Sequence, residues 1–186
     1  AGGDTLILNS DGAPINMIPH LSTLSWKDAI SKVIAGKVDV LDYFDKTVRS
    51  QYEEIRIPAI VITKQWCSNP RVAKFNSKTV FLRDNYICQY CHNEFPESLL
   101  TMDHCYTPKS KGGKLCFENV VTSCMPCNSS KGNKFFKPLN APFVPTYYDL
   151  VQQKKKRSIR INHPSWAFYI GWDENKIILN DWKFRI

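Results

Sequence analysis

The first third of the chain alternates short apolar runs with polar turn residues. Two of these runs, Leu6–Leu8 and Pro14–Ile18, flank the turn sequence Ser10–Gly12, a pattern that predicts two strands joined by a turn. The same alternation predicts three more short strands, around residues 38–41, 55–57 and 60–62. Proline cannot donate a backbone hydrogen bond to a sheet, so Pro58 is expected to separate the last two strands.

Apolar positions after residue 25 follow helical spacing instead. Ser25 and Asp28 form the sequence pattern of a capping box, and the apolar stripe that begins at Trp26 continues to Ile34 and stops before a glycine. Residues 1–66 are therefore expected to form a small mixed α/β unit whose apolar positions build a core rather than a functional site.

The chain contains seven cysteines, and four of them form two Cys-x-x-Cys pairs. A spacing of two residues lets both sulfurs of a pair reach one ion from a tight turn, and four thiolates suit tetrahedral zinc. An odd cysteine count, in a chain long enough to build its own core, argues against a disulfide framework. We predict one structural zinc ion bound by Cys88, Cys91, Cys124 and Cys127. The other thiols, of Cys67, Cys105 and Cys116, are expected to be small buried apolar groups.

The segment around and between these pairs predicts a strand, a loop, a second strand and a helix. Residues 80–84 form an amphipathic lead-in, and Asp103 and His104 follow on the first strand. Glycines within residues 109–114 mark a flexible loop, the second strand is expected at 118–121, and the helix at the second cysteine pair. A carboxylate beside a histidine is typical of a hydrolytic metal site.

Basic residues are concentrated in one part of the chain. The net charge is +8, and residues 131–160 alone hold eight basic residues against the single acidic Asp149. This segment contains the run Lys154, Lys155, Lys156 and Arg157. Such a run is often only a solvated face, but beside a hydrolytic site we interpret it as a surface that follows a nucleic-acid backbone. Arg83 and Lys131 are two further candidates for phosphate contacts, with an ordinary surface position as the alternative.

The end of the chain combines the basic run with many aromatic residues, and residues 139–186 are expected to form a separate extension. Hydrophobic residues make up 43% of the chain, which suffices for one or two small cores. Since no apolar run approaches the roughly 18 residues that span a bilayer, we expect a soluble intracellular protein with reduced thiols and no membrane partner.

Asp103 and His104, followed by Asn119 and Asn128 inside a four-cysteine frame, resemble the motif of the HNH endonuclease family and its ββα-metal fold. The third motif position, usually histidine, is Asn128 here, so the motif is an HNN variant. The N-terminal unit resembles that of stand-alone bacterial and phage members. The implied fold class is α+β, with a mixed α/β unit at 1–66, a zinc-held HNH nuclease core at 67–138 and a basic, aromatic-rich extension at 139–186.

The resemblance also implies a role for each motif residue. A divalent cation, Mg²⁺ or Mn²⁺, is implied on Asp103 and Asn128, where it polarises the scissile phosphate. His104 is implied to be the general base, and Asn119 to fix the loop and orient His104 by a hydrogen bond. Neighbouring residues on a strand point to opposite faces, so Asp103 and His104 can reach one phosphate only if the strand ends or bends there.

The implied activity is metal-dependent hydrolysis of phosphodiester bonds in double-stranded DNA. The protein would act as a monomer or homodimer in the cytoplasm of a bacterial cell or a phage-infected host. A zinc module that binds nucleic acid without cutting it leaves the Asp-His and Asn residues unexplained. A zinc nucleobase deaminase would use His92 and Glu94 with the second cysteine pair, but Ser123 replaces the usual proline and the first pair would lose its partners. A purely structural zinc protein does not account for the basic segment.

Overall fold

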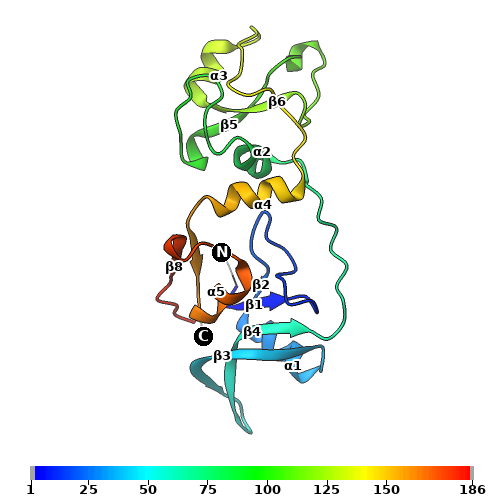
Figure 1. Cartoon of the computed structure of the whole chain (residues 1–186), viewed down its shortest axis with the longest axis vertical. Coiled ribbons are helices and arrows are strands. Elements are labelled where there is room, and N and C mark those ends of the chain that lie inside the picture. The colour runs from blue at the N-terminus through cyan, green and yellow to red at the C-terminus, as the bar shows by residue number, and fades with distance from the viewer. Residues whose placement is uncertain (1–2, 185–186) are drawn as a thin grey trace. The chain divides into compact units, whose positions relative to one another are not determined.

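A computed structural model describes residues 3–184 and divides the chain into two compact units. The first unit is formed by the chain up to Pro70 and again from Arg157 onward, and the second by Arg71–Lys156. Figure 1 shows the blue and cyan N-terminal elements in the same unit as the orange and red C-terminal elements. The expected separate extension at 139–186 is therefore wrong, because residues 139–156 belong to the second unit and the rest of the tail to the first.

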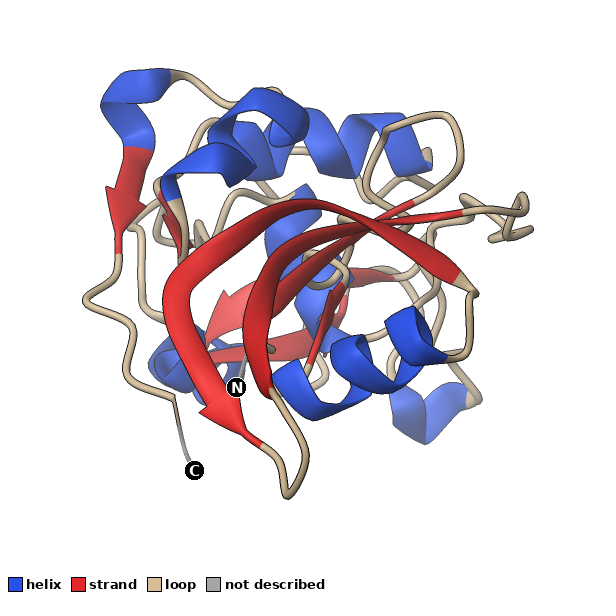
Figure 2. Cartoon of the chain, turned by 90° about the horizontal axis from the view of Figure 1, so that it is seen from below, coloured by secondary structure: helices blue, strands red, loops and turns tan. Residues whose placement is uncertain are grey.

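The first unit is built on a mixed four-stranded sheet with the strand order β2-β1-β4-β3. Its strands are β1 (Thr5–Leu8), β2 (Thr23–Leu24), β3 (Val38–Arg49) and β4 (Glu54–Thr63). β1 pairs antiparallel with β2 and parallel with β4, while β3 and β4 form a long antiparallel hairpin. Figure 2 shows the long strands curving strongly, which agrees with register shifts along the β3–β4 ladder.

Two expectations for this sheet are wrong. Pro58 does not separate two strands but lies inside β4, opposite Tyr43, where the ladder has register shifts on both sides. A proline is tolerated there because a bulged ladder leaves positions that need no backbone donor. The expected strand at Pro14–Ile18 is reduced to one bridge between Pro14 and Leu8, and the antiparallel partner of β1 is β2 instead.

The helix expected in the first unit is present as α1 (Trp26–Ile34). Its N-terminus is capped as the sequence predicts, since the Ser25 side chain accepts a hydrogen bond of 3.1 Å from the Asp28 backbone N–H. The helix packs against the sheet through an apolar stripe, with Ala29 fully buried.

The C-terminal tail completes the core of the first unit. It forms β7 (Ile159–Ile161), η3 (Pro164–Trp166), α5 (Ala167–Ile170), η4 (Glu174–Lys176) and β8 (Ile177–Leu179), with β7 and β8 paired in parallel. Trp166 and Ile170 are buried in one cluster with Leu6 and Ile57, and the Trp166 Nε1–H donates to the Ala59 carbonyl at 2.8 Å. Burial of these large apolar side chains explains why the tail is not a separate extension.

The second unit contains α2 (Ser77–Arg83), η1 (Glu97–Leu99), β5 (Leu100–His104), η2 (Lys109–Lys111), β6 (Val120–Cys124), α3 (Met125–Lys131) and α4 (Tyr147–Lys155). The strand, loop, strand and helix order predicted for this segment is present as β5, the η2 loop, β6 and α3. β5 and β6 pair antiparallel, with Asp103 opposite Val121 and His104 opposite Val120. A small core of Val80, Phe117 and Val120 joins α2 to β6.

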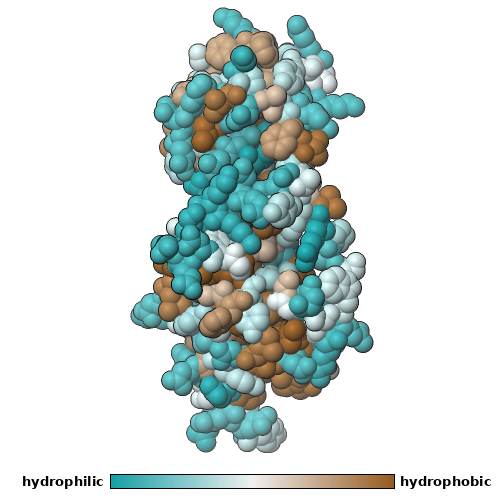
Figure 3. All heavy atoms as spheres, in the orientation of Figure 1, coloured by the Kyte–Doolittle hydropathy of each residue, from teal (hydrophilic) through white to brown (hydrophobic). Residues whose placement is uncertain are grey.

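Figure 3 shows apolar side chains scattered among hydrophilic ones over the visible face, with hydrophilic residues predominant at α4. Among residues 3–184, no helix combines the length and apolar character that a bilayer crossing requires.

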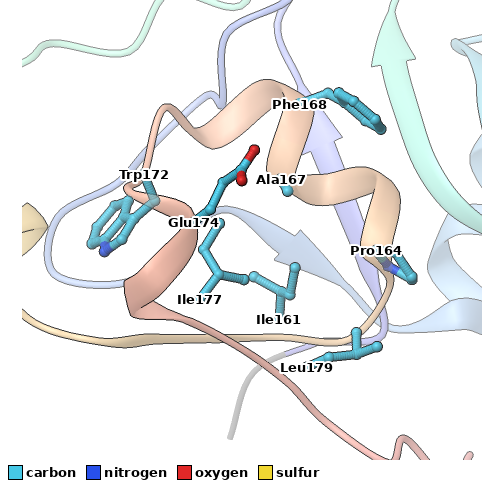
Figure 4. Close-up of a pocket in the computed structure, with 8 residues that line it drawn as sticks. All are labelled: Ile161, Pro164, Ala167, Phe168, Trp172, Glu174, Ile177 and Leu179. Atoms are coloured by element: carbon cyan, nitrogen blue, oxygen red, sulfur yellow. The ribbon is translucent and has the colours of Figure 1, made fainter.

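A shallow pocket of about 350 Å³ lies in the first unit, between α5 and the β7–β8 pair. It is lined by Ile161, Pro164, Ala167, Phe168, Trp172, Glu174, Ile177 and Leu179. In Figure 4 the Glu174 carboxylate points toward the helix that carries Ala167, and the other labelled side chains are apolar or aromatic. A lining with one charged group lacks the converging polar groups of a catalytic site.

Candidate metal centre and active site

The second cysteine pair lies where β6 leads into α3, and the turn of the first pair is joined to β6 by the Gln89 backbone N–H, which donates to the Thr122 carbonyl at 2.9 Å. Cys88 and Cys91 lie on a tight turn in which the His92 backbone N–H donates to the Cys88 carbonyl at 2.9 Å. Cys124 is the residue that precedes α3, and Cys127 lies in the first turn of that helix. The Sγ atoms of Cys88, Cys91, Cys124 and Cys127 all lie within 4.8 Å of one another.

This arrangement fits a tetrahedral metal ion. Zinc–sulfur bonds of about 2.3 Å place the four sulfurs of a tetrahedral site about 3.8 Å apart. The Cys91 and Cys124 Sγ atoms are 4.0 Å apart, close to that spacing. The cluster could therefore hold a metal such as zinc, and the spacing argument correctly predicted which four of the seven cysteines meet.

The pKa values of the thiols also indicate a metal site. Burial opposes ionisation of Cys88, but the backbone N–H groups of Cys91, Cys124 and Tyr90 outweigh it and lower the Cys88 pKa to about 6. Burial raises the pKa of Cys124 and of Cys127. Without a cation, one thiolate suppresses ionisation of its neighbours, so a fully ionised cluster requires a bound metal.

A second polar cluster surrounds Asp103 at the end of β5. The buried Asp103 Oδ2 atom accepts a hydrogen bond of 2.5 Å from the Tyr90 hydroxyl. It also forms an ion pair of 2.9 Å with Lys131 Nζ, which in turn donates to the His104 carbonyl at 2.9 Å. Lys131 thus fixes the side chain of one motif residue and the backbone of the next, and it balances the buried carboxylate charge from within the protein.

His104 is the last residue of β5, and the strand end satisfies the geometric condition derived from the sequence. Beyond it, the Cys105 backbone N–H donates to the Asn119 carbonyl at 2.7 Å. The His104 ring is half-buried, and its Nε2 atom is buried with no hydrogen-bond partner in the described part of the chain. A buried ring nitrogen without a partner is rare in folded proteins, which marks His104 as a candidate functional residue.

Asn119 holds the loop that follows His104. Its Oδ1 atom accepts from the backbone N–H groups of Tyr106 and Thr107 at 3.1 and 2.9 Å. Its Nδ2 group donates to the carbonyls of Thr107 and Lys114 at 2.9 and 3.1 Å. These four bonds fill the hydrogen-bonding capacity of the amide. The loop-fixing half of the expected role agrees with this geometry, whereas a side-chain bond that orients the His104 ring does not.

Asn128 lies half-buried on α3, three residues before Lys131. Residues at this spacing lie on the same face of a helix. Because Lys131 reaches Asp103 on β5, this spacing places Asn128 on the side of α3 that carries the Lys131 contact. The position is compatible with an oxygen ligand shared with Asp103.

Two side chains that were expected to contact phosphates, those of Arg83 and Lys131, are buried, so this expectation is wrong. Arg83 is 4% exposed and Lys131 is 2% exposed. The Arg83 guanidinium binds Asp84 through Nε and Nη2, and it also donates to the carbonyls of Phe117, Val120 and Phe143 at 2.7–2.9 Å. These bonds use all five of its N–H groups, so Arg83 is a structural cation. Lys131 is committed to Asp103 and the His104 carbonyl.

Sequence reasoning missed Tyr90, which lies between Cys88 and Cys91. Burial, together with the hydrogen bond to Asp103, raises the Tyr90 pKa, so the hydroxyl stays protonated and donates to the carboxylate. The position of Tyr90 inside the Cys-x-x-Cys turn could have indicated this contact. If the two cysteine pairs share an ion, the turn must lie beside β5 and β6.

The basic run is less uniform than its sequence indicates. Lys154 and Lys155 lie in the last turn of α4 and Lys156 caps it, where positive charge complements the helix dipole. Burial lowers the pKa of Lys154 to about 8, whereas Lys156 is exposed. Binding of nucleic acid by the basic run remains a prediction. The more exposed side chains of the run are expected to make most of the contacts.

Two family models match the chain. The model described as HNH endonuclease matches residues 88–144, a range that includes both cysteine pairs and all four motif residues. The model described as HNH endonuclease-associated, N-terminal domain matches residues 5–71, which include α1 and the four-stranded sheet. Comparisons with curated proteins and with solved structures give no significant match. Because the two matched segments coincide with the sheet unit and with the four-cysteine ββα frame, the chain belongs to the HNH endonuclease family.

Proposed function

We propose that this protein is a metal-dependent endonuclease that hydrolyses phosphodiester bonds in DNA, with double-stranded DNA as the first substrate to test. The observation that carries the proposal is the end of β5, where His104 Nε2 has no hydrogen-bond partner among residues 3–184 and the preceding Asp103 carboxylate is held by Lys131. Family membership supports nuclease activity in general, and the chemistry of these side chains supports the specific roles.

His104 is the proposed general base. Its free ring nitrogen accepts the proton of the water that attacks the phosphorus. The Lys131 bond to the His104 carbonyl and the Asn119 bonds to the following loop hold the backbone at this residue and directly after it. Asn119 thereby positions His104 through the backbone.

Asp103 and Asn128 offer oxygen atoms of the kind that Mg²⁺ and Mn²⁺ prefer. Such an ion, when bound, polarises the scissile phosphate and stabilises the leaving 3′ oxygen. On the protein side, Tyr90 and Lys131 both contact Asp103 Oδ2 and so orient the carboxylate before substrate arrives. We assign the four-cysteine cluster to structural Zn²⁺, which holds the turn carrying Tyr90 against α3.

One observation favours a second candidate function. The Asp103 charge is already balanced by Lys131, so the cluster is stable as a purely structural ion pair. A zinc-containing protein that binds DNA without cutting it would have this feature. The two candidate functions give Asp103 and Asn128 different roles. An endonuclease needs both residues for cleavage, whereas a binding protein needs them only for folding.

The test measures cleavage of supercoiled plasmid in the presence of Mg²⁺ or Mn²⁺ and again after EDTA is added. The zinc content of the protein is measured on the same samples. The proposal predicts nicked or linear product only with the added cation, and roughly 10²-fold or greater loss in Asp103→Asn and Asn128→Ala. Asn128→His should retain activity with an altered metal preference, since imidazole is also a metal ligand. Asn133→Ala, an exposed amide just beyond α3, is the matched control. Folded, zinc-loaded wild type that leaves plasmid intact under all these conditions favours the binding protein.

A further inference from the structure

A pair of exposed aromatic side chains lies beside the proposed active site. Tyr106 is 52% exposed and Phe135 is 60% exposed, and both belong to the second unit. Their rings are nearly parallel, at 15°, with centroids 6.2 Å apart. Large aromatic rings are normally buried, so two that stack on each other at the surface form a flat apolar face in contact with water.

This aromatic pair is close to the reacting groups. Tyr106 follows His104 by two residues, a separation of about 7 Å at most along the chain. Phe135 follows Lys131, the partner of Asp103, by four residues. The pair therefore brings together the two chain segments that leave the active site, one after β5 and one after α3.

The backbone under the pair is held in place. The Tyr106 N–H donates to Asn119 Oδ1, and the Lys134 N–H donates to the Lys131 carbonyl at 3.0 Å. Fixed backbone lowers the entropy that is lost when a ligand stacks on the rings. The surrounding surface is cationic, since the same two segments carry exposed lysines at positions 109, 111, 114, 134 and 137.

We propose that Tyr106 and Phe135 form a stacking platform for an unpaired nucleobase next to the scissile phosphate. The preferred substrate is then DNA in which bases at the cleavage point are unpaired, as in a single strand or a bulged duplex. Aromatic rings combined with lysines suit this ligand, because stacking tolerates any base and the cations follow the backbone. A base inside an intact duplex is stacked on both faces and presents no free face to the pair. This inference rests on the proposed function, because that function defines where the scissile phosphate lies.

The experiment measures binding rather than cleavage. The protein carries His104→Ala, which removes the proposed base, and the probes are a single-stranded oligonucleotide containing 2-aminopurine and its fully paired duplex. We expect tighter binding of the single strand, with 2-aminopurine fluorescence quenched by stacking. Adding Tyr106→Leu or Phe135→Ala should weaken single-strand binding about 5- to 150-fold, leave duplex binding nearly unchanged and restore the fluorescence.

Two controls separate stacking from a general effect on the surface. Tyr106→Phe keeps the ring and should behave as the parent. Tyr148→Ala removes a more exposed ring from α4 and should leave the ratio of single-strand to duplex affinity unchanged. Equal affinity for both probes in every variant overturns the platform, and so does an equal loss on both probes. If the wild-type protein cuts no DNA but the binding pattern is as predicted, the proposed function fails while the platform stands.

Discussion

The four-cysteine cluster and the Asp103 cluster share the turn at residues 88–91 and helix α3, yet their charges are balanced in opposite ways. The four thiols face one another, and burial raises the pKa of two of them, so their full ionisation depends on a bound cation. Asp103, by contrast, is paired with Lys131 and Tyr90, so its charge is balanced without an ion. The comparison supports our proposal that a metal stabilises the fold at the first cluster, whereas the Asp103 cluster keeps its charge balanced with or without a bound ion.

Removing the cation from the first cluster should have the largest effect. Cys91→Ser is expected to unfold the second unit, because binding of a structural zinc contributes on the order of 10 kcal/mol to folding. Circular dichroism and zinc content measured on the same sample check this. Cys116→Ser, at a half-buried thiol outside the cluster, is the control that should keep both zinc and fold. A zinc-free Cys91→Ser protein with an unchanged melting transition contradicts the assignment.

Removing the internal counter-charge at the second cluster should be costly but smaller. Lys131→Met leaves a buried carboxylate unpaired, and we expect a loss of about 3–5 kcal/mol in the free energy of unfolding. Urea denaturation at fixed zinc content measures it, with exposed Lys134→Met as the matched control. Combining Lys131→Met with Asp103→Asn should recover part of the loss, since no charge then remains unpaired. Equal stability of the two lysine variants would show that the ion pair is dispensable.

The smallest expected effect comes from the basic run, which belongs to neither cluster. Neutralising Lys154, Lys155, Lys156 and Arg157 together should reduce the log-log salt slope of DNA binding by up to about four units, with the cleavage site unchanged. The contribution of Lys154 depends on pH: its pKa is lowered to about 8, so it is charged below that pH and loses its charge as the pH rises through it. The slope of the wild-type protein should therefore fall between pH 7 and pH 9. An unchanged slope in the quadruple variant identifies the run as a solvated face.

How much the sequence predicts depends on whether the relevant partners are local. The Cys-x-x-Cys spacing, the Ser25 cap and the strand, loop, strand and helix order rest on short-range patterns, and all three are present in the structure. Arg83 was misplaced because its acceptors come from residues as far along the chain as Phe143. The tail was misplaced for the same reason, since the Trp166 Nε1–H binds the Ala59 carbonyl, 107 residues earlier in the sequence.

The most direct test of the account compares wild type with His104→Ala on the same DNA. Zinc content, DNA affinity and the Mg²⁺-dependent cleavage rate are measured on matched samples of the two proteins. The account predicts one zinc ion per chain in both, near-equal affinity, and a cleavage rate at least roughly 10²-fold lower in the variant, because only the general base is lost. Cleavage by zinc-loaded His104→Ala at the wild-type rate would contradict the assignment of the end of β5 as the reacting centre.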